Sequence, residues 1–114
     1  MNETIFEAQA ELCRVFTHPT RIQVLELLSE VERSVTELAE ASGVPQPTLS
    51  QHLSVLRSRG VVTTRRDGTT VYYGLADERI VEACHLMRSV LLDRYRSLGR
   101  HAEGVPKRRK GARK

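Results

Sequence analysis

Apolar side chains recur at helical spacing through the first 30 residues of the chain. A helix is predicted over residues 3 to 16, with an apolar stripe formed by Ile5, Leu12 and Phe16. His18-Pro19 interrupts this pattern, because the residue before a proline disfavours helical geometry whereas proline suits the first position of a new helix. A second helix is therefore expected after this point, with an apolar stripe formed by Ile22, Leu25 and Leu28.

Two shorter helices are predicted next, each with a clear start and stop. The run Ser34-Val35-Thr36-Glu37 predicts a capping box, in which the hydroxyl and the carboxylate each bond one unpaired amide at the helix start. Gly43 then supplies a left-handed stop. The fourth helix begins at Gln46-Pro47, ends at Gly60 and carries an apolar stripe of Leu49, Leu53 and Leu56. Two short helices joined by a tight turn with a glycine predict a helix-turn-helix.

The pattern then changes to β-branched and aromatic runs, at Val61 to Arg66 and Thr69 to Leu75. Asp67-Gly68 between these runs predicts a hairpin turn, since both positions tolerate positive φ. Asp77 caps a long final helix, whose stripe is Ile80, Cys84, Met87, Leu91, Tyr95 and Leu98. The expected fold is mainly α with a small β-hairpin, a winged helix-turn-helix of order α-α-α-α-β-β-α.

The charge of the chain is distributed unevenly. The 114 residues suffice for one compact domain, and we expect a winged-helix domain over residues 1–103 and a basic, disordered tail over residues 104–114. The formal net charge is +4, but the tail alone carries +6 and the domain -2. Within the domain, residues 46–73 hold four arginines and one aspartate. The positive charge of the domain is therefore concentrated on the fourth helix and the wing.

The fourth predicted helix has the composition of a DNA-reading helix. Such a helix enters a major groove about 12 Å wide with small or amide-bearing side chains in its first turns. Together with arginines at the helix end and the wing, the predicted DNA-contacting set is Gln46, Pro47, Thr48, Ser50, Gln51, His52, Ser54, Arg57, Arg65 and Arg66. For His52, a packing role is the alternative to DNA contact. For the set as a whole, the alternative is a solvated helix face with ordinary surface cations.

Four runs of the sequence together resemble the ArsR/SmtB family of winged-helix repressors. They are His18 to Leu25, Val35 to Ala39, Gln46 to Leu53, and Val55 to Arg57 with Gly60 to Val62, and the resemblance covers roughly residues 8 to 98. It implies a homodimer that joins through its first and last helices. It further implies that the fourth helices read successive major grooves of double-stranded DNA at an inverted-repeat operator. An inducer, often a metal ion, would release the DNA.

The metal sites known in this family are incomplete in the chain. The thiolate motif of some members would fall at Ala39 and Ala41. The zinc site of other members would map onto Asp77, Arg79, Val90 and Asp93, so that two of four ligands are missing. An arginine in a ligand position would repel a cation, and we expect neither site.

The remaining candidates for sensing a signal are Cys13, Cys84 and His85. If the first and last helices pack together across the dimer, as the resemblance implies, the two sulfurs could meet in a disulfide or polysulfide bridge. With His85 or His101, the two sulfurs could instead bind a thiophilic metal or metalloid, and this ion would then be the cofactor of the protein. A third alternative is a constitutive regulator in which both cysteines are small buried hydrophobic side chains.

Other classes of function have weaker support. The sequence has no Ser, His and acid constellation, no glycine-rich phosphate loop and no paired carboxylates in an apolar setting, so an enzyme is not expected. The absence of a long apolar run or signal-peptide pattern predicts a cytoplasmic protein without a membrane partner. We therefore predict a DNA-binding transcriptional repressor. The alternatives are an interaction module with a vestigial helix-turn-helix, and a general chromosome- or RNA-binding protein driven by the tail.

Overall fold

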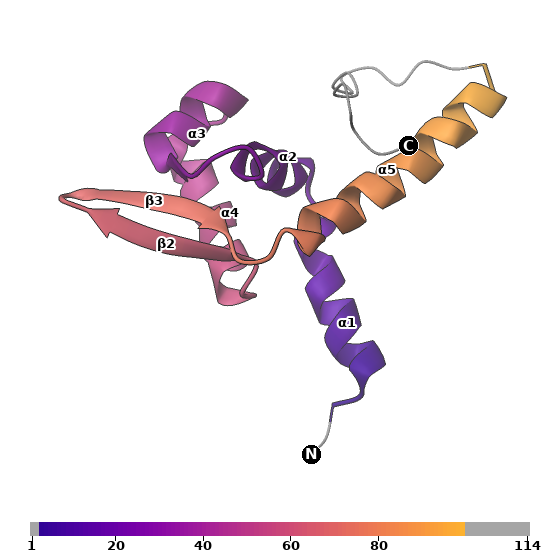
Figure 1. Cartoon of the computed structure of the whole chain (residues 1–114), viewed down its shortest axis with the longest axis horizontal. Helices are drawn as coiled ribbons and strands as arrows, with labels where there is room; N and C mark the ends of the chain where they lie inside the picture. Colours follow the sequence, from indigo (N-terminus) through magenta and orange to yellow (C-terminus); the bar gives the residue numbers. More distant parts are fainter. Residues whose placement is uncertain (1–2, 100–114) are drawn as a thin grey trace. The chain divides into compact units, whose positions relative to one another are not determined.

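The computed structural model describes residues 3–99 and divides the chain into two compact units, Met1–Glu82 and Ala83–Lys114. The predicted tail, residues 104–114, lies outside the described residues. The element order is α1 (Ile5–Cys13), the 3-10 helix η1 (Arg14–Phe16), α2 (Pro19–Leu28), β1 (Arg33–Ser34), α3 (Val35–Ser42), α4 (Gln46–Ser58), β2 (Val62–Asp67), β3 (Thr70–Leu75) and α5 (Arg79–Ser97). In the first unit, the hairpin of β2 and β3 extends beside α3 and α4 (Figure 1). This order confirms the predicted winged helix-turn-helix.

Capping boxes set the starts of α1 and α3. At α3, the Glu37 amide donates to Ser34 Oγ at 3.1 Å, and the Ser34 amide donates to the Glu37 carboxylate at 2.9 Å. The same reciprocal pair joins Thr4 and Glu7 at the start of α1. The box at α3 was predicted from the sequence, whereas the box at α1 was not. The sequence pattern also predicted a single helix through residue 16, whereas α1 ends at Cys13 and the chain tightens into η1.

Proline and glycine fix the boundaries of the helix-turn-helix. Gly43 ends α3 with φ +76°, a left-handed conformation that strongly favours glycine. Pro45 in an extended conformation precedes α4, and Pro47 occupies its first turn, where a missing amide costs no intrahelical hydrogen bond. The turn between α3 and α4 is therefore three residues long and has the composition that the sequence indicated.

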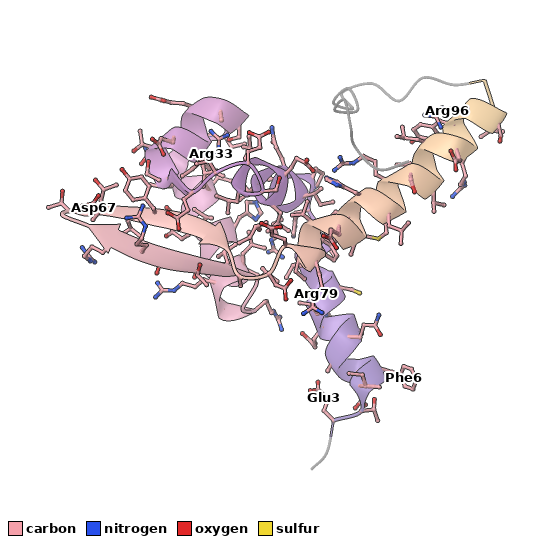
Figure 2. All side chains as sticks on the ribbon, in the orientation of Figure 1. Glu3, Phe6, Arg33, Asp67, Arg79 and Arg96 are labelled. Carbon is pink, nitrogen blue, oxygen red and sulfur yellow. The ribbon has the colours of Figure 1, made fainter. Side chains whose placement is uncertain are left out.

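The wing belongs to a three-stranded antiparallel sheet of order β1-β3-β2. The short strand β1, which the sequence analysis missed, pairs with β3. The predicted turn was wrong by one residue, since Asp67 pairs with Thr70 and the loop is Gly68-Thr69. Gly68 alone in this loop has positive φ, +66°, as a type II′ turn requires. Asp67 consequently ends β2 near the hairpin tip (Figure 2).

A single aliphatic core holds the first unit together. Its members are at most 4% exposed and come from η1, from helices α2 to α5, and from the start of β2 and the residue before it: Val15, Val24, Leu25, Leu28, Leu38, Leu49, Leu53, Leu56, Val61, Val62 and Val81. Within residues 3–99, every buried side-chain nitrogen or oxygen has a hydrogen-bond partner. Because its three leucines are directed into this core, α4 presents its polar side chains to solvent.

The second unit consists, in its described part, of the remainder of α5. Large apolar side chains on this helix remain exposed, namely Leu86, Met87, Val90 and Leu91. Nevertheless, no helix within residues 3–99 has the length and apolar character needed to cross a membrane.

Candidate nucleic-acid interface

Helix α4 separates a buried apolar face from an exposed polar face. Leu49, Leu53 and Leu56 are at most 1% exposed. Seven of the predicted DNA-contacting residues are exposed on the same helix: Gln46, Pro47, Thr48, Ser50, Gln51, Ser54 and Arg57. Amide and hydroxyl groups dominate this surface, and both types can bond base edges or phosphates. The helix is therefore anchored on one side and available for polar contact on the other.

The first turn of α4 combines a contact to α3 with uncapped amides. Gln46 Nε2 donates to Thr36 Oγ1 at 3.3 Å, which joins the two helices of the helix-turn-helix. No side chain caps the amides at the start of α4. Amides in this position, with the positive end of the helix dipole, form a favourable environment for a phosphate group. The start of α4 can therefore contribute to backbone contact as well as to base contact.

His52 is the one predicted α4 contact that is partly buried. Its Nδ1 accepts a hydrogen bond from Arg21 Nε at 3.2 Å, and its ring lies 5.4 Å from the His18 ring, centroid to centroid. Partial burial lowers the pKa of His52 first, and the charges of Arg21 and His18 lower it further. This environment supports the packing role that the sequence left open for His52.

The arginines around α4 and the wing fall into two groups. Arg65 pairs with Glu32 at 2.9 Å and lies over the Tyr72 ring at 4.9 Å from its centroid. Arg59, at the end of α4, pairs with Glu11 of α1 at 2.7 Å. Arg57 and Arg66 are exposed, and neither has an ion-pair partner among residues 3–99. The two groups are thus equal in number but differ in their availability to phosphate.

These ion pairs were not visible in the sequence. Glu11 and Glu32 lie outside residues 46–73, so the local excess of positive charge is smaller in the fold than along the chain. Each pair joins residues more than 30 positions apart. A carboxylate next to the arginines at i±3 or i±4 would have been a local signal, and the sequence has none there.

The predicted sensing residues occupy different surroundings. Cys13 is exposed on α1, Cys84 is buried on α5, and His85 is exposed. The alternative in which both cysteines are small buried hydrophobic side chains therefore does not hold for Cys13 within the single chain. Within residues 3–99, no group of three or more His, Cys, Asp or Glu side chains is placed to hold a metal ion.

Asp77 shows why the family's last-helix zinc position is unsuitable here. Its carboxylate accepts hydrogen bonds from the Arg79 amide at 2.9 Å and from the Arg79 guanidinium at 2.7 Å. These bonds lower the pKa of Asp77 to about 2. The carboxylate therefore caps α5 and neutralises Arg79, which occupies another of the four positions that correspond to zinc ligands in other members of the family.

Comparisons with known proteins agree with this geometry. The model of the arsR family of bacterial regulatory proteins matches residues 18–64. The transcriptional regulator KmtR of Mycobacterium tuberculosis is 39% identical over 102 residues, covering 90% of this chain and 73% of KmtR. These findings confirm the predicted class of transcriptional regulator, as opposed to enzyme.

Solved structures extend the likeness to the whole winged helix. The crystal structure of Rv0081 from M. tuberculosis has a TM-score of 0.74 and 40% identity, covering 84% of this chain and 97% of that one. The homodimeric winged helix-turn-helix DNA-binding domain Mb0332 from Mycobacterium bovis, a possible ArsR-family regulator, has a TM-score of 0.73 and 31% identity, covering 86% and 91%. The chain therefore belongs to the ArsR/SmtB family of winged helix-turn-helix transcriptional regulators.

Proposed function

We propose that the protein is a homodimeric transcriptional repressor that binds an inverted-repeat operator through α4 and the wing. The observation that carries this proposal is the division of α4 into a fully buried leucine face and an exposed face of amides and hydroxyls. A rigid helix with such a face can insert into a major groove without rearranging the core behind it.

The proposed dimer is supported by apolar side chains that the chain leaves uncovered. Ile5 and Phe6 of α1 are 71% and 78% exposed, and Phe6 projects outward from its helix (Figure 2). The exposed apolar residues of α5 provide a second such surface. Mb0332, a similar structure, is homodimeric. A two-fold dimer would space its two α4 helices by about one DNA turn, ~34 Å, and would match an inverted repeat.

The contacts can be divided by their chemistry. Gln46 and Gln51 suit adenine edges, and the hydroxyls of α4 suit phosphates or mixed base contacts. Arg57 and Arg66, which lack ion-pair partners among the described residues, are the main candidates for phosphate. Arg65 is already paired with Glu32, which offsets its charge and makes it a weaker candidate for phosphate.

Selection of preferred sites from a random duplex library, followed by titration of the selected and a scrambled duplex, tests this function. We expect Gln51→Ala to relax sequence preference, and Arg66→Ala to weaken both duplexes about equally and to reduce the salt slope by about one. Failure of the wild type to enrich any sequence would overturn the proposal. Deletion of residues 104–114 is the control, because a tail-driven binder would lose nearly all affinity whereas a repressor would retain its selectivity.

For the signal, we propose that Cys13 and Cys84 respond together across the dimer to an oxidant or to a polysulfide, which would accept two electrons as the two thiols lose their protons and join in a disulfide or polysulfide bridge. Exposure of Cys13 on α1, one of the two proposed interface helices, supports this assignment. Thiol counting and intact mass before and after treatment test it, with Cys84→Ser as the control variant. A thiophilic metal or metalloid is the second candidate inducer. If both thiols remain unmodified and DNA affinity is unaffected, the cysteines are structural.

A further inference from the structure

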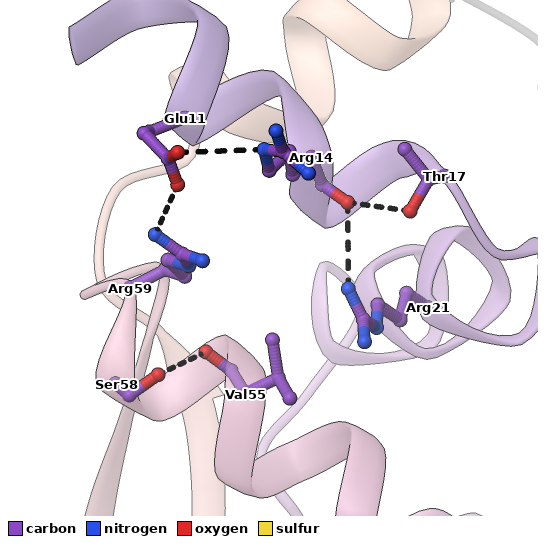
Figure 3. Close-up of polar contacts among 7 residues, drawn as sticks. All are labelled: Glu11, Arg14, Thr17, Arg21, Val55, Ser58 and Arg59. Carbon is purple, nitrogen blue, oxygen red and sulfur yellow. Dashed lines mark hydrogen bonds and ion pairs between the residues drawn. The ribbon is translucent and has the colours of Figure 1, made fainter.

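Arg21 lies where three elements of the first unit meet. Its Nε donates to His52 Nδ1 on α4 at 3.2 Å, and its Nη1 donates to the Arg14 carbonyl of η1 at 3.4 Å. Thr17 Oγ1 donates to the same carbonyl at 2.8 Å (Figure 3). One side chain of α2 therefore connects the end of the α1–η1 segment to the middle of the proposed DNA-reading helix.

We propose that Arg21 is a positioning residue for α4, which it holds through His52 in the orientation that reads DNA. This inference rests on the proposed function of α4. Leu49, Leu53 and Leu56 hold the helix against the core through apolar contacts, which are non-directional. A hydrogen bond beside them adds a directional restraint on the orientation of the helix, because its strength falls steeply with angle.

The chemistry of the contact requires an arginine and a neutral histidine. A guanidinium presents several donors in one rigid plane and can serve two acceptors at once, whereas the single ammonium of lysine lacks this fork. Because His52 Nδ1 is the acceptor, its neutral ring carries the proton on Nε2. Protonation at Nδ1 would place a donor and a positive charge against the Arg21 guanidinium.

The second link between the α1–η1 segment and α4 is an ion pair. Glu11 of α1 pairs with Arg59 at the end of α4 (Figure 3). Both partners are about 40% exposed, and exposed ion pairs contribute little. Arg21 therefore adds a second polar connection to this ion pair: its bond to His52 of α4 is partly buried, and its bond to the Arg14 carbonyl, directly after α1, is exposed. In the proposed dimer, the contacts of Arg21 would help to set the position of each α4 relative to the dimer interface.

The charged groups facing His52 all come from the start of α2. They are Arg21 and His18, and both lower the pKa of His52 below its ordinary value of 6.5 after the larger effect of burial. The stabilisation that neutral His52 provides is therefore fully present above pH 6.5. It is lost as the pH falls from 6.5 through the lowered pKa of the folded state.

The other elements packed against α4 are α3 and β2. Of the charged side chains on these elements, the Glu37 carboxylate bonds the Ser34 amide and Arg65 pairs with Glu32. The others, Glu40, Arg66 and Asp67, are exposed, and none of the five contributes to the lowered pKa of His52. The pH response of the junction is therefore expected to reflect His52 itself.

The test compares four full-length variants on the selected duplex and its scrambled counterpart. We expect Arg21→Lys and His52→Leu to lower the ratio of selected to scrambled affinity about fivefold or more at pH 7.5, a loss of about 1 kcal/mol or more in discrimination. His52→Asn keeps an acceptor at the Nδ1 position and is expected to stay within about twofold of the wild type. Arg33→Lys is the matched control, because Arg33 also bridges a carbonyl and a side chain, Leu27 and Glu30, but contacts neither α4 nor the wing arginines.

A pH series separates positioning from loss of structure. The wild-type ratio is expected to fall as the pH is lowered below 6.5 through the lowered pKa of His52, whereas His52→Asn lacks this response, since asparagine does not titrate. If Arg21→Lys or His52→Leu fails to fold, this comparison still decides the question.

Two negative results have different meanings. A wild type that prefers no sequence overturns the proposed function and the positioning role with it. A selective wild type whose four variants discriminate equally, with identical pH profiles, overturns the positioning role alone.

Discussion

Helices α4 and α5 have similar amphipathic patterns but different coverage. On α4, Leu49, Leu53 and Leu56 are at most 1% exposed, because α2, α3 and the sheet surround them. On α5, Leu86 and Val90 are 66% and 57% exposed. Periodicity in a sequence therefore shows which side chains share a face, but it does not show whether the same chain covers that face. In this protein, the covered helix is proposed to read DNA and the uncovered one to bind a second copy.

The largest effect is expected from breaking the covered face. Leu53→Ala removes a side chain that is 1% exposed and leaves a cavity, which is expected to lower the free energy of unfolding by about 2–5 kcal/mol. Urea denaturation at low protein concentration measures this loss. Leu86→Ala is the matched control and is expected to change it by less than about 1 kcal/mol in the monomer. Equal losses at the two positions would contradict the contrast between the helices.

The next effect concerns the uncovered face. Val90→Asp places a charge on the exposed surface of α5 and is expected to weaken dimerisation on the order of 30-fold, about 2 kcal/mol. Sedimentation across a concentration series measures the dissociation constant. Glu82→Gln, a polar change on the same helix, serves as the control. A Val90→Asp variant that dimerises as tightly as the wild type would show that this face has another role.

Local signals account for most of what the sequence predicted correctly. The capping box at Ser34 and Glu37, the stop at Gly43 and the start at Pro47 involve neighbours within one turn, so their chemistry could be read directly. The hairpin turn was misplaced by one residue because Asp67-Gly68 and Gly68-Thr69 both contain a suitable glycine. Pairing across the sheet, and not turn composition alone, selected between them.

Long-range contacts account for what the sequence could not show about the site. His52 lies within a run of polar residues, and only the fold places it beside Arg21, 31 positions earlier. Arg65 appeared to be an available cation until Glu32 was placed next to it. Composition therefore identified the segment that we propose to contact DNA, while the availability of individual side chains required the tertiary structure.

A smaller effect compares the two capping boxes. Ser34→Ala is expected to cost about 1 kcal/mol of unfolding free energy, since Ser34 is 8% exposed and its box starts the helix-turn-helix. Thr4→Ala removes the same motif from α1, which has no buried residue, and is expected to cost about 0.5 kcal/mol or less. Thermal unfolding of the two variants measures the difference. If Thr4→Ala costs as much as Ser34→Ala, then α1 is held to the fold more firmly than its exposure indicates.

The smallest effect extends the comparison from apolar to charged side chains. Arg65 forms an ion pair with Glu32 of its own chain, whereas Arg66 on the same strand has no ion-pair partner among the described residues. Glu32→Gln is expected to leave Arg65 unpaired, like Arg66. The pair is about half exposed, and its loss is expected to change unfolding free energy by less than about 0.5 kcal/mol. Release of one arginine is nevertheless expected to raise affinity for scrambled DNA by about two- to threefold and to steepen the salt slope by about one. Glu30→Gln, which frees Arg33 instead, is the matched control. If the two variants bind scrambled DNA equally, Glu32 does not restrain Arg65, and the wing arginines do not differ in their availability to phosphate.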